Sequence, residues 1–259
     1  MLGRQPHVHR LTIALTAAAT MAAAAGGPVG VAVGSSAVSP RVEALSLGMT
    51  YRRVSDERTH TASAVVLRAM GVRAEPDGDA RRVGRVGSAT YLGSADSVLV
   101  LGRAQGVDQG WSFVRYPGLG QRTGWVPTSG LGPTTVVRER LVIDRRRLRA
   151  TLYRGRRVLV RAPIGVGAED SPTPAGRGYV RERFIPRKAA SIYGVLAFGL
   201  SVYSRYRTDW PGGGQVGLHG TNQPELIPGR ISNGCIRLRN PDVRRLGRQL
   251  RIGTPVEIL

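Results

Sequence analysis

Short apolar runs separated by turn residues dominate the chain between residues 63 and 134. Glycine- and proline-containing turns lie between these runs, for example at residues 75–78 and 117–118. Short runs with regular turn signals are typical of β-strands, so this part is expected to form a small all-β barrel. The runs comprise residues 65–67, 83–86, 97–101, 111–116 and 124–126.

Strand patterns continue through residues 135–259. Segment 136–143 alternates imperfectly between apolar and polar residues, whereas segment 148–152 alternates well. Segment 158–164 is nearly continuous in apolar residues, so we expect a buried strand there. Two prolines in segment 171–176 predict a turn or an extended loop, because proline disfavours helix at the residue before it.

One short helix is expected near the C-terminus. Asn240 belongs to a residue type that caps helices, Pro241 suits a first helical turn, and Gly253 marks the expected end. The apolar residues of one face are Val243, Leu246 and Leu250. With a final strand at 254–259, the fold class is mainly β: a small barrel over residues 63–134, then a β-sheet-rich domain with short helices over residues 135–259.

Residues 1–39 have the three parts of a secretory signal. Arg4 and Arg10 supply a positive start, residues 11–25 are apolar but short for a membrane span, and small residues follow. No cysteine lies near the cleavage region, which argues against a lipid anchor, while an uncleaved signal that stays as an anchor remains open. Residues 40–62 are polar without periodicity and are expected to be a linker. The protein is therefore expected to be exported.

Charge changes this picture little. The formal net charge is +21, and arginine carries almost all of the positive charge, since Lys188 is the sole lysine. The arginines are scattered through every segment, whereas a nucleic-acid footprint would be a clustered stripe. Nucleic acid is therefore not an expected partner, although a basic surface favours anionic ones.

The chain contains one cysteine, Cys235, and four histidines. His7 and His9 lie in the signal and His60 in the linker, so His219 alone shares a domain with the thiol. A thiol needs a nearby imidazole to take its proton before it performs acyl transfer. Either residue alone fits a purely structural role equally well, but their shared glycine-rich segment favours a catalytic pair.

This segment resembles the catalytic motif of the L,D-transpeptidase family, bacterial enzymes that crosslink peptidoglycan. The family pattern is a His-Gly pair, a spacer of a dozen or more residues, and then Ser/Thr-His-Gly-Cys. Here HGT stands at residues 219–221 and SNGCIRL at residues 232–238. Asn233 occupies the place where the family usually has a second histidine. The resemblance covers residues 135–259 and implies a YkuD-like catalytic domain.

The resemblance implies that Cys235 is the nucleophile and His219 the base, oriented by a backbone carbonyl beside Gly220. The thiolate would attack the carbonyl on the L-centre of a diamino acid in a tetrapeptide stem and expel the terminal D-Ala. The amine of a neighbouring stem would then resolve the thioester and give a 3-3 crosslink. No metal and no cofactor is expected for this reaction.

The residues around the thiol receive supporting roles from the same resemblance. Backbone N–H groups at Asn233, Gly234 and Cys235 are expected to hold the oxyanion. Ser232 is expected to support the turn. Arg237 either binds a substrate carboxylate or pairs within the fold, and both readings stay open.

The first domain resembles bacterial Src-homology-3-like domains in the order VRAEP, GWSFVRY and TGWV. Trp111, Tyr116 and Trp125 either line a binding groove or form the barrel core. Because this domain contains neither histidine nor cysteine, we expect it to place the enzyme on the cell wall and leave the chemistry to the second domain. Expected partners are peptidoglycan stem peptides and anionic wall polymers, and the protein is expected to be a monomer.

Two other functions remain open. A cysteine peptidase or carboxypeptidase of the wall uses the same groups, although peptidase families usually place the cysteine before the histidine. The non-enzymatic alternative is a wall-binding protein with a degenerate catalytic domain.

Overall fold

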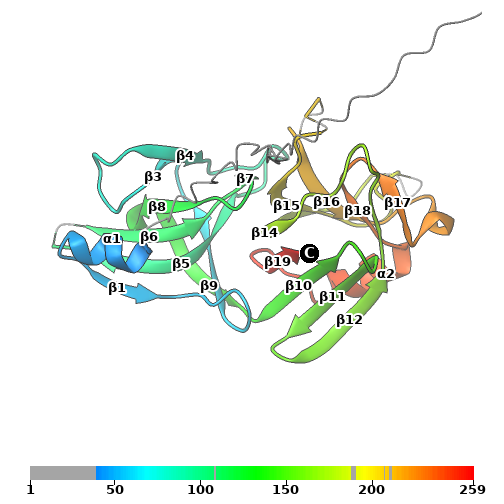
Figure 1. The fold of residues 1–259 in the computed structure, drawn as a ribbon, viewed down its shortest axis with the longest axis horizontal. Helices are drawn as coiled ribbons and strands as arrows, with labels where there is room; N and C mark the ends of the chain where they lie inside the picture. The colour runs from blue at the N-terminus through cyan, green and yellow to red at the C-terminus, as the bar shows by residue number, and fades with distance from the viewer. Residues whose placement is uncertain (1–38, 108, 188–190, 207, 210–211) are drawn as a thin grey trace, which may run out of the picture. The chain divides into compact units, whose positions relative to one another are not determined.

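The structure is a computed structural model that describes residues 39–107, 109–187, 191–206, 208–209 and 212–259 (Figure 1). The described chain is mainly β, with two sheets and two short α-helices. Apart from Ser39, the predicted signal lies outside the described residues. No helix in the described part of the chain is long and apolar enough to cross a membrane.

The first sheet has eight strands in the order β4-β3-β8-β6-β5-β2-β9, with β1 paired to β5. Its strands are β1 (Thr50–Arg53), β2 (Thr61–Val66), β3 (Met70–Arg73), β4 (Arg82–Val86), β5 (Ser97–Gln105), β6 (Gly110–Arg115), β8 (Thr123–Pro127) and β9 (Leu131–Val137), with a 3-10 turn at Thr128–Gly130. The predicted apolar runs fall on β2, β4, β5, β6 and β8. The described pairings do not join β4 to β9, so the closed barrel and the Src-homology-3 likeness stay predictions.

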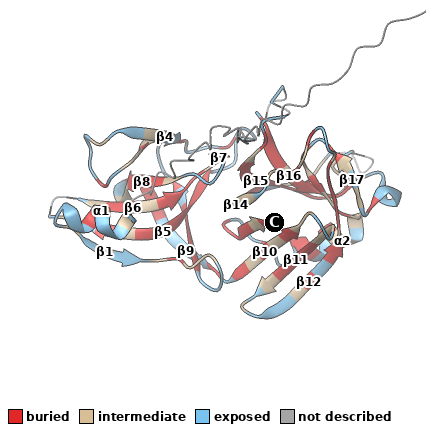
Figure 2. Ribbon diagram, in the orientation of Figure 1, coloured by how far each residue is buried: buried red, intermediate tan, exposed pale blue. Residues whose placement is uncertain are grey.

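Residues 40–62 do not form the linker that their polarity predicts. They form α1 (Pro40–Ser46), β1 and the start of β2. Ala44 is fully buried on α1, and Asp56 Oδ1 accepts backbone N–H groups of residues 58–60 at 2.8 Å each, which orders the loop before β2. These elements are too short to show a clear periodicity, and β1 exposes most of its residues as an edge strand (Figure 2).

The aromatic residues of the first domain are core residues. Trp111 and Trp125 are 1% and 0% exposed and pack with Ala44, and Tyr116 is also buried. The Trp125 indole N–H donates to the Glu43 carboxylate at 2.8 Å. The interpretation of these rings as a binding groove is therefore wrong.

The second sheet has eleven strands in the order β12-β11-β10-β19-β14-β15-β16-β18-β13-β17, with β7 paired to β15. They are β7 (Gly118–Leu119), β10 (Glu139–Asp144), β11 (Arg149–Arg154), β12 (Arg157–Pro163), β13 (Gly165–Gly167), β14 (Gly176–Phe184), β15 (Ala197–Tyr203), β16 (Gln215–His219), β17 (Gly229–Ser232), β18 (Ile236–Arg237) and β19 (Pro255–Ile258), with a 3-10 turn at Pro224–Leu226. Strand β14 pairs with β19 through its first half and with β15 through its second half. Pairing on β15, β16 and β18 sets the position of the Cys235 segment.

Two strand predictions need correction. The expected strand at 136–143 is two strands, because β9 ends at Val137 in the first sheet and β10 begins at Glu139 in the second. The expected buried strand at 158–164 is β12, which alternates and exposes Val158 by 39%. Strand β12 pairs antiparallel with β11, and antiparallel sheets commonly have one solvated face, so the apolar run does not imply full burial. The loop predicted at 171–176 is confirmed, since β14 begins only at Gly176.

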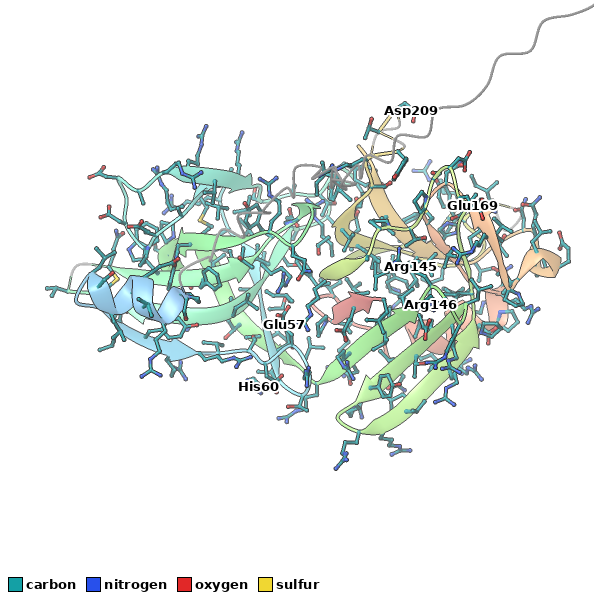
Figure 3. The ribbon with its side chains drawn as sticks, viewed as in Figure 1. Glu57, His60, Arg145, Arg146, Glu169 and Asp209 are labelled. Atoms are coloured by element: carbon teal, nitrogen blue, oxygen red, sulfur yellow. The ribbon has the colours of Figure 1, made fainter. Side chains whose placement is uncertain are left out.

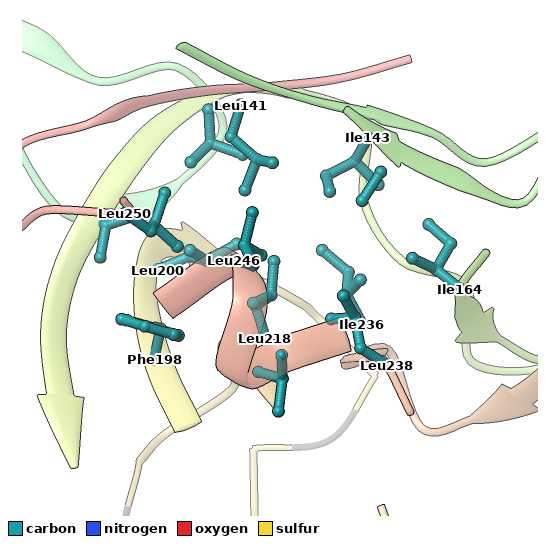
Figure 4. Packing of buried hydrophobic residues seen from close by; sticks show 14 of the residues in the cluster. Leu141, Ile143, Ile164, Phe198, Leu200, Leu218, Ile236, Leu238, Leu246 and Leu250 are labelled. Atoms are coloured by element: carbon teal, nitrogen blue, oxygen red, sulfur yellow. The ribbon is translucent and has the colours of Figure 1, made fainter. Parts of the chain in front are cut away.

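The core of the second domain lies between its sheet and helix α2 (Asn240–Gly247), as Figure 4 shows for ten labelled residues. Val243, Leu246 and Leu250 are all buried, as the spacing predicts. The expected cap is wrong: Arg239 is the N-cap, and the side chain of Asn240 instead accepts N–H groups of Val195 and Thr221 at 3.3 and 3.2 Å. The helix ends at Gly247, earlier than predicted.

Candidate active site

Parallel pairing of β16 with β18 brings Cys235 and His219 together. Leu218 lies opposite Ile236 and His219 lies opposite Arg237, so Cys235 comes beside Gly217. The Gly217 N–H donates to Cys235 Sγ at 3.4 Å. A Cβ added to Gly217 would lie 3.4 Å from both Cys235 Sγ and His219 Cδ2. Thiol and imidazole therefore face the same space over a glycine.

His219 is buried and held in one tautomer. Its Nδ1 donates to the backbone carbonyl of Gly220 at 2.6 Å, which leaves Nε2 without a proton in the neutral ring. The ring of Tyr193 meets it edge to face, with ring centroids 5.0 Å apart. Burial lowers the pKa of His219 to about 4, and the positive charge of Arg237 adds to this effect against the Gly220 carbonyl. His219 is accordingly a neutral proton acceptor at pH 7.

The thiol is held in its neutral form as well. Burial raises the pKa of Cys235, while the Gly217 N–H and the charge of Arg237 act in the opposite direction. A raised thiol pKa next to a lowered imidazole pKa favours a neutral pair over a thiolate and imidazolium pair. Nucleophilic attack by such a thiol would require transfer of its proton to His219.

The turn that presents the thiol depends on Ser232 and Gly234. Ser232 is buried, and its hydroxyl donates to the Cys235 carbonyl at 2.5 Å and accepts the Gly234 N–H at 3.2 Å. Gly234 has φ +104°, a conformation that side chains rarely adopt. Because the Gly234 N–H already has an acceptor, Gly234 serves the turn, which leaves Asn233 and Cys235 as the expected N–H donors to an oxyanion.

Arg237 brings a positive charge to the site. It lines the same cavity as Cys235 and His219, and its Nε is buried with no hydrogen-bond partner in the part of the chain that the structure describes. No carboxylate among the described residues forms an ion pair with it. Of the two roles expected for Arg237, this environment favours binding of a substrate carboxylate over pairing within the fold.

Asn240 fixes the backbone after His219. Its Oδ1 accepts the N–H groups of Val195 and Thr221, and a Cβ on Gly220 would collide with that oxygen. The Gly220 N–H donates to Leu196 O at 3.0 Å. Gly220 is therefore required for close packing, and this packing aims its carbonyl at His219 Nδ1.

A cavity of about 570 Å³ opens over the thiol. Its walls carry apolar and aromatic side chains from β14, β15, β16 and their connections, among them Phe184, Tyr193 and Phe198. Asp209, labelled in Figure 3, lies on the segment before β16 and also lines the cavity. Among the described residues, no group of three or more His, Cys, Asp and Glu side chains could hold a metal ion.

The first domain also reaches this cavity. Tyr91 and Leu92, from the connection between β4 and β5, line it together with Cys235. Burial raises the pKa of Tyr91 to about 12, with further contributions from Glu182, Tyr193 and Cys235. Asp96 anchors this connection through a buried ion pair with Arg181 of β14 (Nε–Oδ1 2.8 Å). The expectation that the first domain only places the enzyme on the wall is therefore incomplete, because this domain builds part of the site.

The motif in the sequence identified the residues at the thiol but not those farther along the cavity. Tyr91 lies in a polar turn segment with no catalytic signature, and Asn240 carries the signal of a helix cap. Their roles depend on contacts between segments far apart in the chain, which local patterns do not encode.

Residues 138–258 match the family model of the YkuD L,D-transpeptidase catalytic domain. Two curated relatives carry L,D-transpeptidase names. YkuD of Bacillus subtilis (strain 168) is 35% identical over 108 residues, which cover 42% of this chain and 58% of the relative. YbiS of Escherichia coli (strain K12) is 29% identical over 155 residues, which cover 52% of this chain and 48% of the relative.

Among solved structures, the catalytic domain of the E. faecium L,D-transpeptidase is 24% identical, with 46% of this chain and 95% of that chain covered and a TM-score of 0.34. The chain spans about half the length of the curated relatives, 58% of YkuD and 48% of YbiS. The match over residues 138–258 contains the whole segment that brings His219 to Cys235. By this match, residues 138–258 correspond to a YkuD L,D-transpeptidase catalytic domain.

Proposed function

We propose that this protein is an exported peptidoglycan L,D-transpeptidase that uses Cys235 as nucleophile and His219 as general base. The observation that carries the proposal is the placement of thiol and imidazole over Gly217, with His219 Nδ1 bound to the Gly220 carbonyl. This tautomer presents an unprotonated Nε2, which is what a base for the thiol needs.

The reaction begins when His219 Nε2 takes the Cys235 proton as Sγ attacks the carbonyl on the L-centre of a stem diamino acid. A C–S bond forms, and the carbonyl oxygen becomes an oxyanion that the N–H groups of Asn233 and Cys235 hold. The oxyanion collapses, the C–N bond to D-Ala breaks, and the imidazolium gives its proton to the departing amine. A thioester remains on Cys235.

The second half of the reaction runs through the same groups. An amine of a neighbouring stem attacks the thioester carbonyl and forms a C–N bond, while His219 accepts the amine's proton. The C–S bond then breaks, and His219 returns the proton to the departing sulfur of Cys235. Water in place of the amine gives hydrolysis, so the balance between crosslinking and carboxypeptidation depends on which nucleophile fills the cavity. Asn233 in place of the family's second histidine leaves this dyad intact, which argues against a degenerate wall-binding protein.

Charge and the sequence of residues 1–39 support the remaining parts of the proposal. The signal features support export to the wall, periplasmic or extracellular space. The net charge of +21 favours association with anionic wall polymers.

Incubation of the mature protein with purified tetrapeptide stems, followed by mass spectrometry of the products, tests the proposal. We expect release of D-Ala and a crosslinked dimer that contains one D-Ala fewer than its two parent stems. Cys235→Ala should give neither product, and Cys235→Ser is the matched control that keeps the side chain's size. Release of D-Ala by Cys235→Ala would refute the assignment of the nucleophile.

A further inference from the structure

Glu182, on β14, is a buried carboxyl group without a partner. The residue is 1% exposed, and neither carboxyl oxygen has a hydrogen-bond partner among the described residues. Gln215, on β16, is also buried; its Nε2 donates to Leu200 O at 3.0 Å, which leaves Oε1 unpaired within the described chain. Buried polar atoms are almost always satisfied, so three such oxygens in one place mark a site for a hydrogen-bond donor.

Glu182 and the thiol lie in one row across the sheet. Glu182 pairs with Gly199 of β15, Gly199 pairs with Gly217 of β16, and Gly217 donates to Cys235 Sγ. Gly199, Gly217 and Gln215 all line the cavity over the thiol. The two glycines add no side chain to this row, and Glu182 Oε1 and Gln215 Nε2 lie over Gly199.

Contacts at the two glycines limit the distance between Cys235 and Glu182. A Cβ on Gly199 would lie 2.6 Å from Glu182 Oε1 and 2.5 Å from Gln215 Nε2, whereas a Cβ on Gly217 would lie 3.4 Å from Cys235 Sγ. Facing Cβ positions on neighbouring strands are about 5 Å apart, so Sγ and Glu182 Oε1 can be no more than about 11 Å apart. The side chain of a diamino acid spans roughly 7 Å from its main-chain carbonyl carbon to its amine, about five to six covalent bonds of ordinary length. A diamino acid acylated on Cys235 can therefore reach Glu182.

We propose that Glu182, assisted by Gln215 Oε1, binds the side-chain ammonium of the diamino acid whose carbonyl Cys235 attacks. This inference rests on the function proposed above and names the group that selects the acyl donor. A primary ammonium supplies the donors that these three unpaired oxygens lack, and a charged donor makes the strongest hydrogen bonds to a carboxylate. Arg237, near Cys235, presents the opposite charge, so the cavity distinguishes the two kinds of charged substrate group by position.

The test compares two stem tetrapeptides that differ only at the third residue, whose side-chain amine is free or acetylated. Lysine and meso-diaminopimelate are both tried as that residue, and the one that the wild-type protein turns over is kept. D-Ala release gives kcat/KM, and the rate of carbapenem addition to Cys235 reports separately on the dyad. The variants are Glu182→Gln, Gln215→Met and the control Glu139→Gln, a buried glutamate that pairs with Arg154 away from the cavity.

The wild-type protein should prefer the free amine by about tenfold to a hundredfold in kcat/KM, the usual worth of a hydrogen bond to a charged group. Glu182→Gln should lose this preference, keep its rate on the acetylated peptide within about threefold and keep its carbapenem rate. Gln215→Met should lose part of the preference, and Glu139→Gln none of it. These comparisons also hold if one cavity variant fails to fold, because the wild-type preference and the other variant each test the site.

Three results would overturn the inference. They are equal turnover of both peptides by the wild-type protein, an unchanged preference in Glu182→Gln, and loss of carbapenem addition in a folded Glu182→Gln, which would place Glu182 in the dyad's support. Failure of the wild-type protein on every stem and with the carbapenem would instead refute the proposed function itself.

Discussion

The protonation state of Cys235 is the most distinctive property of this site and can be measured directly. Burial raises the pKa of the thiol from an ordinary value of 9.0, and burial lowers the pKa of His219 to about 4. A thiol with a pKa above 9 is less than about 1% thiolate at pH 7, because each pH unit below the pKa reduces the thiolate tenfold. The resting pair is then a thiol beside a neutral imidazole.

Alkylation by iodoacetamide reports the thiolate, since the thiol itself does not react at a useful rate. Between pH 6 and 8 the rate for Cys235 should rise about tenfold per pH unit. Because Cys235 is the single cysteine, intact-protein mass spectrometry counts each addition without ambiguity. The urea-unfolded protein provides the matched control and should react faster at every pH in this range, because its thiol is no longer buried.

The charge of Arg237 provides a second test of the pKa of Cys235. Arg237 acts to lower the pKa of Cys235, so Arg237→Gln should slow alkylation at pH 8 below that of the wild-type protein. A wild-type rate that stays constant from pH 5 to 8 would refute the reasoning, because it would show a thiolate and imidazolium pair formed before the substrate arrives.

Three further predictions follow from the surroundings of the dyad. His219 has a folded pKa of about 4 against an ordinary value of 6.5, so the folded state binds fewer protons than the unfolded state between these pH values. The free energy of unfolding should therefore fall by up to about 3 kcal/mol from pH 6.5 to 4. Urea titrations should show a smaller fall in His219→Gln. Asn240→Ala removes the acceptor of two backbone N–H groups and should cost roughly 1–3 kcal/mol of stability together with most of the activity, whereas Asn240→Asp, which keeps an acceptor, should retain more of both in the same assays. Because Tyr91 lines the cavity, Tyr91→Ala should raise KM for a stem tetrapeptide while a small carbapenem still adds to the thiol. A protein beginning near Thr134 should likewise lose turnover of soluble stems. Full turnover by a folded protein of that length would show that the first domain does not shape the site.

The sequence predicts the part of this molecule in which local pattern and final environment agree. Strands β2, β4, β5, β6 and β8 and the buried face of α2 follow from apolar spacing. Val243, Leu246 and Leu250 lie on one face of the helix and share one core. The meeting of His219 and Cys235 was expected from the motif, and the parallel pairing of β16 with β18 is the physical cause of it.

The remaining features depend on tertiary contacts. Asn240 carries the residue type of a helix cap, but its Oδ1 accepts the N–H groups of Val195 and Thr221, which lie far from it in the sequence. In the sequence, Glu182 is one polar residue among several charged ones in its strand. Only the structure shows that it is buried beside Gly199. The linker prediction failed for a similar reason, because Ala44 finds its partners on strands far along the chain.

The most direct test of the central claim is the mass of the protein after incubation with a stem tetrapeptide in the absence of an acceptor amine. We expect a single acyl adduct whose mass equals the tetrapeptide less one D-Ala and that maps to Cys235, forms far more slowly in His219→Gln and is absent from Cys235→Ala. An adduct of that mass on Cys235→Ala, or adduct formation at the wild-type rate in a folded His219→Gln, would contradict the account.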